Sequence, residues 1–276
     1  MTVTVVTDGG AALPAEVARA YGVEVVPLGL ALGGDPVDGD GDGLARVVAS
    51  PAGAAHTSSP PPGRFVAALR RHGDGGVLIC TVAAALSSTY QSALLAARQA
   101  GGPVRVLDSG SAAGGQALVV LAAARAAGAG GTLDQVAAAA ERAAADVRLA
   151  AAVDSLERLV AGGRVPEVLG WAGRRLGLLP LFELRAGRVR PLAPAFSRAA
   201  AERRILARWR AGRTPGAAAH VVALHALAPQ RAERLLATVR AEVDPATAFV
   251  GEFDAAMVAH TGPGVVGLAW RWELTS

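Results

Sequence analysis

Residues 77–100, VLICTVAAALSSTYQSALLAARQA, carry the pattern that decides the fold. The run Val77–Val82 is short, apolar and β-branched, which predicts a buried strand. Small and polar residues follow it, and residues 87–100 then have the composition of a helix. A buried strand that leads through a small polar loop into a helix is the repeating unit of a parallel α/β sheet.

The same alternation extends in both directions from this unit. We predict strands at residues 2–7, 23–32 (interrupted by Pro27), 77–82 and 104–107, and helices at 13–21, from 44, at 63–71, 87–100, 115–127 and 133–147. Strands that alternate with helices of this length favour a parallel sheet with helices on both faces. The first part of the chain is therefore predicted to be an α/β/α domain.

The second half has a less regular order of elements. We expect a strand at 149–153, a short helix at 155–160, a helical region to 175, a hairpin of strands 179–184 and 189–192, helices at 197–211 and 229–243, strands at 221–225 and 247–251, and a last strand pair around 260–264. This order predicts an α+β domain with a mixed sheet. Because Ala161–Arg164 (AGGR) breaks the chain, we expect two domains, 1–160 and 161–276.

The basic residues exclude several functions. All 27 of the Lys and Arg residues are Arg, and the net charge is only +4. Without Lys there is no P-loop, no protein-kinase lysine and no Schiff-base chemistry. The Arg residues are scattered and only 4% of residues are aromatic, so the pattern favours codon bias over a nucleic-acid-binding surface.

Cysteine, histidine and apolar stretches indicate whether the chain binds a metal or enters a membrane. The single cysteine, Cys80, lies within a predicted strand and is typical of a core residue. There is no His/carboxylate spacing for a metal, and His72, His220 and His225 are expected to be structural. The N-terminus has no signal-peptide pattern, and no uncharged apolar stretch reaches the roughly 18 residues of a membrane span. We expect a cytoplasmic protein without stable membrane insertion, metal or cofactor.

Three polar clusters stand out against these apolar surroundings. They are His56–Pro62 (HTSSPPP), Leu86–Ser92 (LSSTYQS) and His260–Gly264 (HTGPG). The first cluster precedes a predicted helix and the second opens one, so their hydroxyls either cap those helices or bind an anion or a carbonyl oxygen. In the third, two glycines around a proline predict a backbone bend, and a histidine in such a bend favours a functional role.

Polar residues also follow the predicted parallel strands. Asp8 and Ser109 come after two of the strands, and Ser87 follows the strand 77–82. Ligands of open α/β sheets bind beyond the carboxyl ends of the strands. We therefore expect Asp8, Ser87 and Ser109 to gather at one rim of the sheet.

Several motifs, in order along the whole chain, resemble those of the DegV family. They are VTDGGAALP (6–14), VPL (26–28) with a Gly-rich loop to Asp38-Gly39, TSSP (57–60), LSSTYQSA (86–93), VLDS (106–109), the LVAGGRV segment (159–165) and HTGPG (260–264). The chain departs from the family pattern at Gly9, at Ala83-Ala84 and at Ser88. It also departs at Leu179, where the family has Lys, and at Phe196, which leaves Arg198 as the nearest guanidinium.

The resemblance implies a two-domain α/β protein that buries a long-chain fatty acid in a tunnel between its domains. It also implies presentation of the fatty acid to a separate ATP-dependent kinase that forms an acyl phosphate, so the chain itself would not be an enzyme. On the matching positions, Thr57 and Ser87 would hold the carboxylate, with His260 beside it. Supporting positions would be Asp8, Ser58, Ser88, Thr89, Thr261, Gly163 and Arg164.

Two other functions remain open from the sequence. A diverged lipid carrier or sensor would bind the same ligand without a kinase. A serine hydrolase would use Ser87 with His260 and an acid such as Asp8, although no G-x-S-x-G elbow surrounds Ser87.

Overall fold

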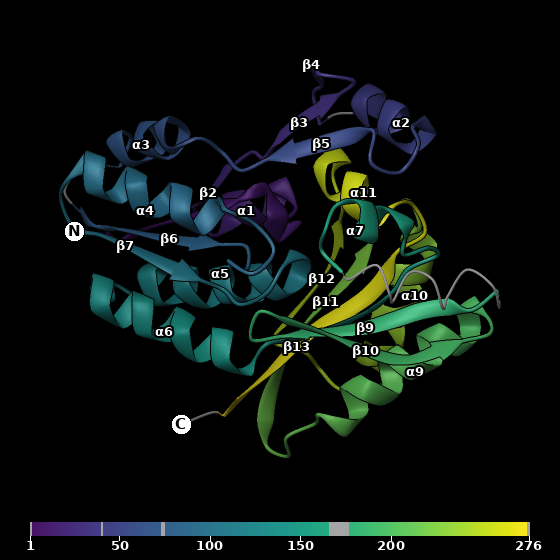
Figure 1. The fold of residues 1–276 in the computed structure, drawn as a ribbon. Helices are drawn as coiled ribbons and strands as arrows, with labels where there is room; N and C mark the ends of the chain where they lie inside the picture. Colours follow the sequence, from purple (N-terminus) through teal and green to yellow (C-terminus); the bar gives the residue numbers. More distant parts are fainter. Residues whose placement is uncertain (1, 40, 73–74, 166–176, 275–276) are drawn as a thin grey trace. The chain divides into compact units, whose positions relative to one another are not determined.

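A computed structural model describes residues 2–39, 41–72, 75–165 and 177–274 (Figure 1). The chain forms two compact units. The first unit comprises residues 1–28, 59–147 and 185–188, and the second unit comprises 29–58, 148–184 and 189–276. This division differs from the single boundary expected after residue 160, because residues 29–58 and 148–160 belong to the second unit.

The first unit contains a four-stranded parallel sheet. Its strand order is β2 (Val23–Val26), β1 (Thr4–Asp8), β6 (Val77–Thr81) and β7 (Val104–Asp108). The register pairs Thr7 with Cys80 and Thr81 with Asp108, so the carboxyl ends of the strands reach one edge together. β6 is buried along its whole length, as its apolar run predicts.

Helices cover both faces of this sheet (Figure 1). α3 (Pro62–Arg70) and α4 (Thr89–Ala100) lie on one face, and α5 (Ala113–Gly128) and α6 (Leu133–Asp146) lie on the other. The short elements η1 (Gly9–Ala11) and α1 (Ala15–Ala20) connect β1 to β2. Phe65 of α3 and Ile79 of β6 are fully buried in the core beneath α3 and α4. The predicted α/β/α arrangement is confirmed.

The second unit is built on a mixed six-stranded sheet. Its order is β10 (Arg188–Ala195), β9 (Leu179–Arg185), β8 (Arg148–Ala152), β13 (Val266–Leu274), β11 (Ala217–His225) and β12 (Thr247–Glu252). β11 and β12 are parallel, whereas β13 is antiparallel to both β8 and β11. α9 (Arg198–Ala211) and α10 (Pro229–Glu242) pack on this sheet around buried Trp209 and Trp270.

A smaller layer of the second unit carries candidate site residues. A three-stranded antiparallel sheet has the order β4 (Asp35–Pro36), β3 (Gly29–Leu32) and β5 (Ala55–Ser58). Helix α11 (Ala255–Thr261) packs against β5 and β3, and also against α2 (Gly41–Ala49) and α7 (Glu157–Ala161). The predicted mixed α+β character of this part is confirmed.

One predicted element of the second unit is wrong. The expected strand pair around residues 260–264 is a helix, α11, followed by a turn and then β13. The carboxylate of Asp254 caps α11 by accepting a hydrogen bond from the Met257 N–H at 2.8 Å. This cap satisfies a free backbone donor of the first turn, and small residues such as Ala255 and Ala256 continue the helix.

The helical region expected up to residue 175 falls partly on residues 166–176, outside the described residues. The single strand expected at 23–32 is wrong: Pro27 separates two strands, β2 and β3, that belong to different sheets. The remaining predicted helices and strands are present, with ends displaced by a few residues.

Candidate functional site

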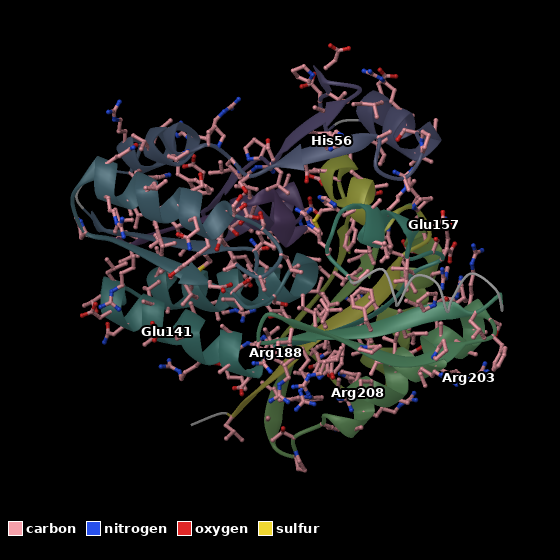
Figure 2. All side chains as sticks on the ribbon, viewed as in Figure 1. His56, Glu141, Glu157, Arg188, Arg203 and Arg208 are labelled. Atoms are coloured by element: carbon pink, nitrogen blue, oxygen red, sulfur yellow. The ribbon has the colours of Figure 1, made fainter. Side chains whose placement is uncertain are left out.

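Thr57 lies on β5 of the second unit and is half-buried. It pairs with Leu30 of β3 in the antiparallel register of the small sheet. Neighbouring residues of a strand point to opposite faces, so Thr57 and Ser58 face different ways. Ser58 is exposed, and its hydroxyl occupies the space beside Gly29 where a Cβ would lie. His56, also exposed, is labelled on β5 in Figure 2.

The side chain of Thr57 meets His260, which lies 203 residues further along the chain. His260 belongs to the last turn of α11, and its Nε2 lies 2.5 Å from Thr57 Oγ1. Helix α11 therefore brings the HTGPG histidine against the TSSP threonine within one unit. Two of the three residues implied to surround the ligand carboxylate are in direct contact.

His260 is neutral at pH 7. Burial lowers the pKa of its imidazole to about 4, and the positive charge of Arg164 acts in the same direction. A neutral imidazole has one N–H donor and one acceptor nitrogen. If Nε2 carries the proton and donates to Thr57 Oγ1, the Thr57 O–H is free to donate to a ligand.

The turn after α7 lies beside this histidine. A Cβ placed on Gly162 would lie 2.8 Å from His260 Nδ1, so the backbone approaches the ring closely. Arg164 Nη1 donates a short hydrogen bond to the Gly162 carbonyl. Gly163, between them, has a φ of +72°, which favours glycine. The GGR segment thus places a guanidinium and a tight turn next to His260.

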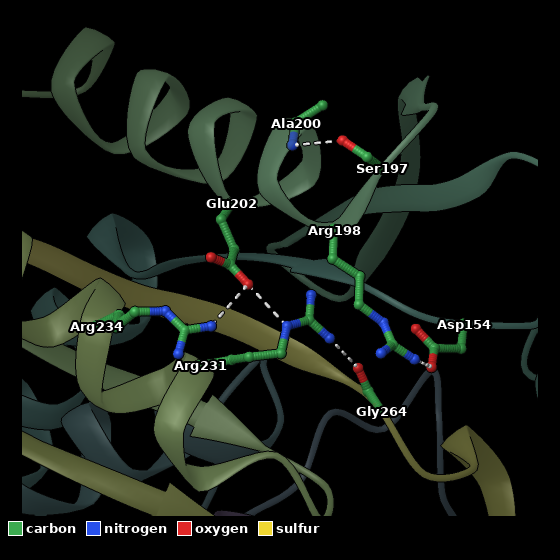
Figure 3. A network of polar contacts seen from close by, with 8 residues as sticks. All are labelled: Asp154, Ser197, Arg198, Ala200, Glu202, Arg231, Arg234 and Gly264. Atoms are coloured by element: carbon green, nitrogen blue, oxygen red, sulfur yellow. Dashed lines mark hydrogen bonds and ion pairs between the residues drawn. The ribbon is translucent and has the colours of Figure 1, made fainter.

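The loop between α11 and β13 is held by polar contacts from other elements of the second unit (Figure 3). The Gly264 carbonyl accepts a hydrogen bond from Arg231 Nη1 at 2.9 Å, and Arg231 also pairs with Glu202. A Cβ on Gly264 would lie 2.2 Å from the Asp154 carboxylate, which pairs with Arg198 at 2.7 Å. The final glycine of HTGPG is therefore required both by its φ of +85° and by close packing.

Thr261 of the same motif uses its hydroxyl locally. Its Oγ1 donates to the Met257 carbonyl of the preceding turn at 3.0 Å and lies 3.4 Å from the Gly262 carbonyl. This contact stabilises the end of α11 and leaves His260 as the polar side chain of the motif that contacts Thr57.

A cluster of hydroxyls lies at the start of α4 in the first unit. Ser59 Oγ lies 2.7 Å from Ser88 Oγ and 3.3 Å from Ser87 Oγ, and Ser87 Oγ lies 2.9 Å from Thr89 Oγ1. The backbone N–H of Thr89 donates to Ser87 Oγ at 3.3 Å. Ser87 is half-buried, Ser88 is exposed and Thr89 is buried. Ser87 and its supporting residues Ser88 and Thr89 are therefore brought together.

These hydroxyls have more protons than their mutual contacts use. The order of contacts is Ser88, Ser59, Ser87, Thr89, so three contacts link four hydroxyls. Each contact uses one O–H proton, which leaves one proton to donate elsewhere. No side chain of an acid or a base takes part in these contacts. The cluster is a neutral donor site that suits an anionic or carbonyl oxygen.

Ser59 is the residue of this cluster whose role the sequence did not assign. Ser59 belongs to the TSSP motif, directly after Thr57 and Ser58. No local pattern predicts its contacts with Ser87 and Ser88, which lie 28 and 29 residues further along the chain. The capping alternative for residues 56–62 is wrong, because the N-cap of α3 is Pro61 and makes no side-chain capping bond.

Asp8 and Ser109 lie at strand ends, as expected, but their polar groups bind the backbone of their own unit. Asp8 is fully buried, and its two carboxylate oxygens accept from the N–H groups of Gly10 and Val82, each at 2.8 Å. Ser109 is also fully buried and donates to the Ser111 carbonyl at 3.1 Å. Both residues shape the loops at the rim of the sheet.

The single cysteine and the other three histidines named in the sequence analysis have contacts typical of structural residues. Burial raises the pKa of the Cys80 thiol to about 12, with a further contribution from the negative charge of Asp8. His72 pairs with Glu24, His220 contacts both Thr247 and Glu273, and burial lowers the pKa of His225. Within the described ranges, no three His, Cys, Asp or Glu residues are grouped so that they could hold a metal. In those ranges no helix has the length and apolar character to cross a membrane.

The fold and these contacts define a class of protein: a two-unit α/β protein with neutral hydroxyl donors on both units and a neutral histidine on one. Residues 2–273 match the family model described as "Uncharacterised protein, DegV family". The chain belongs to the DegV family, as its motifs indicated.

Relatives support this assignment. A DegV domain-containing protein of Streptomyces coelicolor is 36% identical over 275 residues, which cover 96% of this chain and 97% of that protein. A Thermus thermophilus DegV family structure, whose description concerns fatty acid binding, is 30% identical with a TM-score of 0.88 and covers 99% of this chain and 100% of that one. A Bacillus subtilis DegV structure, described as a fatty acid binding protein, shares the fold at 21% identity, with a TM-score of 0.84 and coverage of 99% and 100%.

Proposed function

We propose that this protein binds a long-chain fatty acid and holds its carboxylate with the hydroxyls of Thr57 and Ser87, beside His260. The contact between Thr57 and His260, in which a neutral imidazole lies 2.5 Å from a threonine hydroxyl, is the observation that carries the proposal. The fatty acid binding named for the Thermus thermophilus relative supports the choice of ligand.

The donors suit a carboxylate. Hydrogen bonds to a charged group contribute about 1.5–3 kcal/mol each, more than those between neutral partners. Thr57 has a proton to offer when Nε2–H of His260 donates to it, and the Ser59–Ser87 cluster has one proton in surplus. The positive charge of Arg164, next to His260, also favours an anionic ligand at this position.

The apolar composition suits the acyl chain. Hydrophobic residues make up 52% of the sequence, so aliphatic side chains can line a tunnel. Each buried methylene contributes about 0.8 kcal/mol, so the tail of a sixteen-carbon acid supplies most of the affinity and the hydroxyls fix its orientation. The acyl chain would occupy a buried tunnel, with Ser88, Thr89, Thr261 and Gly163 near its polar end.

We further propose that a separate ATP-dependent kinase phosphorylates the bound carboxylate. The chain has no Lys and hence no P-loop, which supports ATP binding by a partner. The family lysine is replaced by Leu179, which packs against the core of the second unit, and Phe196 is 82% exposed. These two replacements favour, as the second candidate, a carrier or sensor that binds the same ligand without a kinase.

A serine hydrolase is the weakest of the functions considered. Both carboxylate oxygens of Asp8 accept backbone N–H groups, so this acid is engaged in shaping its loop. The hydrogen-bond partners of Ser87 are Ser59 and Thr89, rather than a base. We expect a fluorophosphonate probe to leave Ser87 unlabelled, whereas labelling would establish the hydrolase.

Binding is tested by titration of purified, delipidated protein with palmitate, alongside native mass spectrometry of the protein as purified. We expect a co-purifying C14–C18 acid, and we expect Thr57→Val to weaken palmitate binding by about 10- to 150-fold, as loss of 1.5–3 kcal/mol requires. Thr57→Ser keeps the hydroxyl and should restore much of the affinity. Thr238→Val is the matched control, because Thr238 is half-buried on α10, as Thr57 is on β5, and its hydroxyl donates to the Arg234 carbonyl.

A protein that co-purifies with no acid and takes up no palmitate would refute the proposal. Kinase coupling has its own test: an assay with the kinase of the same organism should form acyl phosphate from the loaded protein. Binding without phosphorylation would favour the carrier or sensor.

A further inference from the structure

The structure assigns to Gly162 the role of a positioning residue for His260: the missing side chain at position 162 leaves the space that the imidazole occupies when it contacts Thr57. Gly162 does not itself bind the ligand; it acts only by leaving space for the ring of His260. The predicted effect of Gly162 on palmitate affinity rests on the proposed function, whereas its predicted effect on the position of the His260 ring does not.

Close approach, rather than backbone conformation, explains the glycine. Gly162 follows α7 with φ −79° and ψ −5°, a conformation that any L-residue adopts without strain. A Cβ at this position would lie 2.8 Å from His260 Nδ1, 3.1 Å from the Arg158 carbonyl oxygen and 3.5 Å from His260 Cε1, so the ring nitrogen is the closest of its neighbours. Real Cβ atoms do not approach a ring nitrogen so closely, so either the imidazole or the turn must move.

The turn is the less movable of the two partners. The Gly162 N–H donates to the Arg158 carbonyl at 2.9 Å, and its own carbonyl accepts from Arg164 Nη1. Arg158 in turn donates to carbonyls at the end of α2, among them Ser50 at 2.5 Å. Because the turn is tied on both sides, an added methyl group should displace the ring of His260.

Displacement of the ring breaks the contact that defines this half of the site. His260 Nε2 lies 2.5 Å from Thr57 Oγ1, so a shift of the ring by a fraction of an ångström changes that hydrogen bond. The Thr57 hydroxyl then loses its fixed orientation. Gly163, the next residue, does not share this role, because nothing lies within 4 Å of its Cβ position and its φ of +72° alone accounts for the glycine.

The test is Gly162→Ala, with the ring nitrogens of His260 observed by ¹⁵N NMR in ligand-free protein and palmitate affinity measured separately. We expect the ring ¹⁵N signals to shift and the Kd for palmitate to rise about tenfold, the equivalent of 1.4 kcal/mol. Gly128→Ala is the matched control, because no atom lies within 4 Å of its Cβ position; it should change neither quantity. A folded Gly162→Ala protein with unchanged ring signals would overturn the inference.

A double-mutant cycle separates positioning from general damage. In a His260→Ala background the contact with the ring is gone, and only the 3.1 Å approach to the Arg158 carbonyl oxygen remains. Gly162→Ala should therefore leave the Kd as it is in His260→Ala alone and lower the melting temperature less than it does in the wild type. If Gly162→Ala does not fold, the double variant should fold. An equal loss in both backgrounds would overturn the inference. If Gly162→Ala shifts the ring signals of His260 but the wild type binds no palmitate, the role of Gly162 stands and the proposed function is refuted.

Discussion

Replacement of His260 by glutamine tests whether the imidazole is held neutral in the folded protein. Glutamine removes the ionisable ring but keeps a polar end that can bond to Thr57 Oγ1. The structure lowers the pKa of His260 from 6.5 to about 4, chiefly through burial. The variant therefore isolates the cost of protonating this one group.

The sign of the effect follows from proton binding in the two states. Between pH 6.5 and pH 4 the unfolded chain takes up a proton at His260 that the folded protein does not, so the free energy of unfolding falls as the pH falls. Each unit of pKa difference is worth 1.36 kcal/mol, and the partial exposure of the ring reduces the total, so we expect a loss of ~2–3 kcal/mol. The contribution is fully present above pH 6.5 and is lost below pH 4.

Urea unfolding of both proteins at several pH values between 7.5 and 4 measures this difference. Other groups with shifted pKa values, such as half-buried Asp254 and buried His225, are present in both proteins and cancel in the comparison. We expect the wild type to lose ~2–3 kcal/mol more than His260→Gln over this range. Parallel curves would refute the reasoning that burial and Arg164 keep the imidazole neutral.

Three further predictions address other parts of the molecule. Ser59→Ala should weaken palmitate binding through Ser87 by about 0.5–1.5 kcal/mol, measured by titration; an unchanged Kd would show that the hydroxyl cluster is not part of the site. Cys80, fully buried with its pKa raised to about 12, should resist iodoacetamide at pH 8 in the native protein but react in urea, and rapid native labelling would contradict this. Thr132→Ala removes the capping box of α6 and should lower the free energy of unfolding by about 1 kcal/mol, which chemical denaturation would measure.

The parallel sheet of the first unit could be predicted because its signals are local. The β-branched and apolar runs of β1 and β6 end at small polar residues, and each pattern is complete within about ten residues. α11 could not be predicted because its residues, AAMVAHT, are apolar and also suit a strand, and the helix is only seven residues long. Its one polar start signal is the Asp254 cap.

The pairing of distant residues could not be predicted in the same way. The segment 29–58 lies between two strands of the first unit in the sequence, yet it packs with α11 of the second unit. Thr57 and His260 are 203 residues apart, and no local pattern encodes their contact. Family motifs named both residues, but only the fold shows that one contacts the other, and that Gly162 leaves room for it.

The central claim is that a fatty acid carboxylate is held by hydroxyls of Thr57 and Ser87. The most direct measurement is palmitate affinity in a cycle of Thr57→Val, Ser87→Ala and the double variant. Each single change should cost about 1.5–3 kcal/mol, with the combined loss departing from their sum because both groups hold one carboxylate. Wild-type affinity in the double variant would contradict the account.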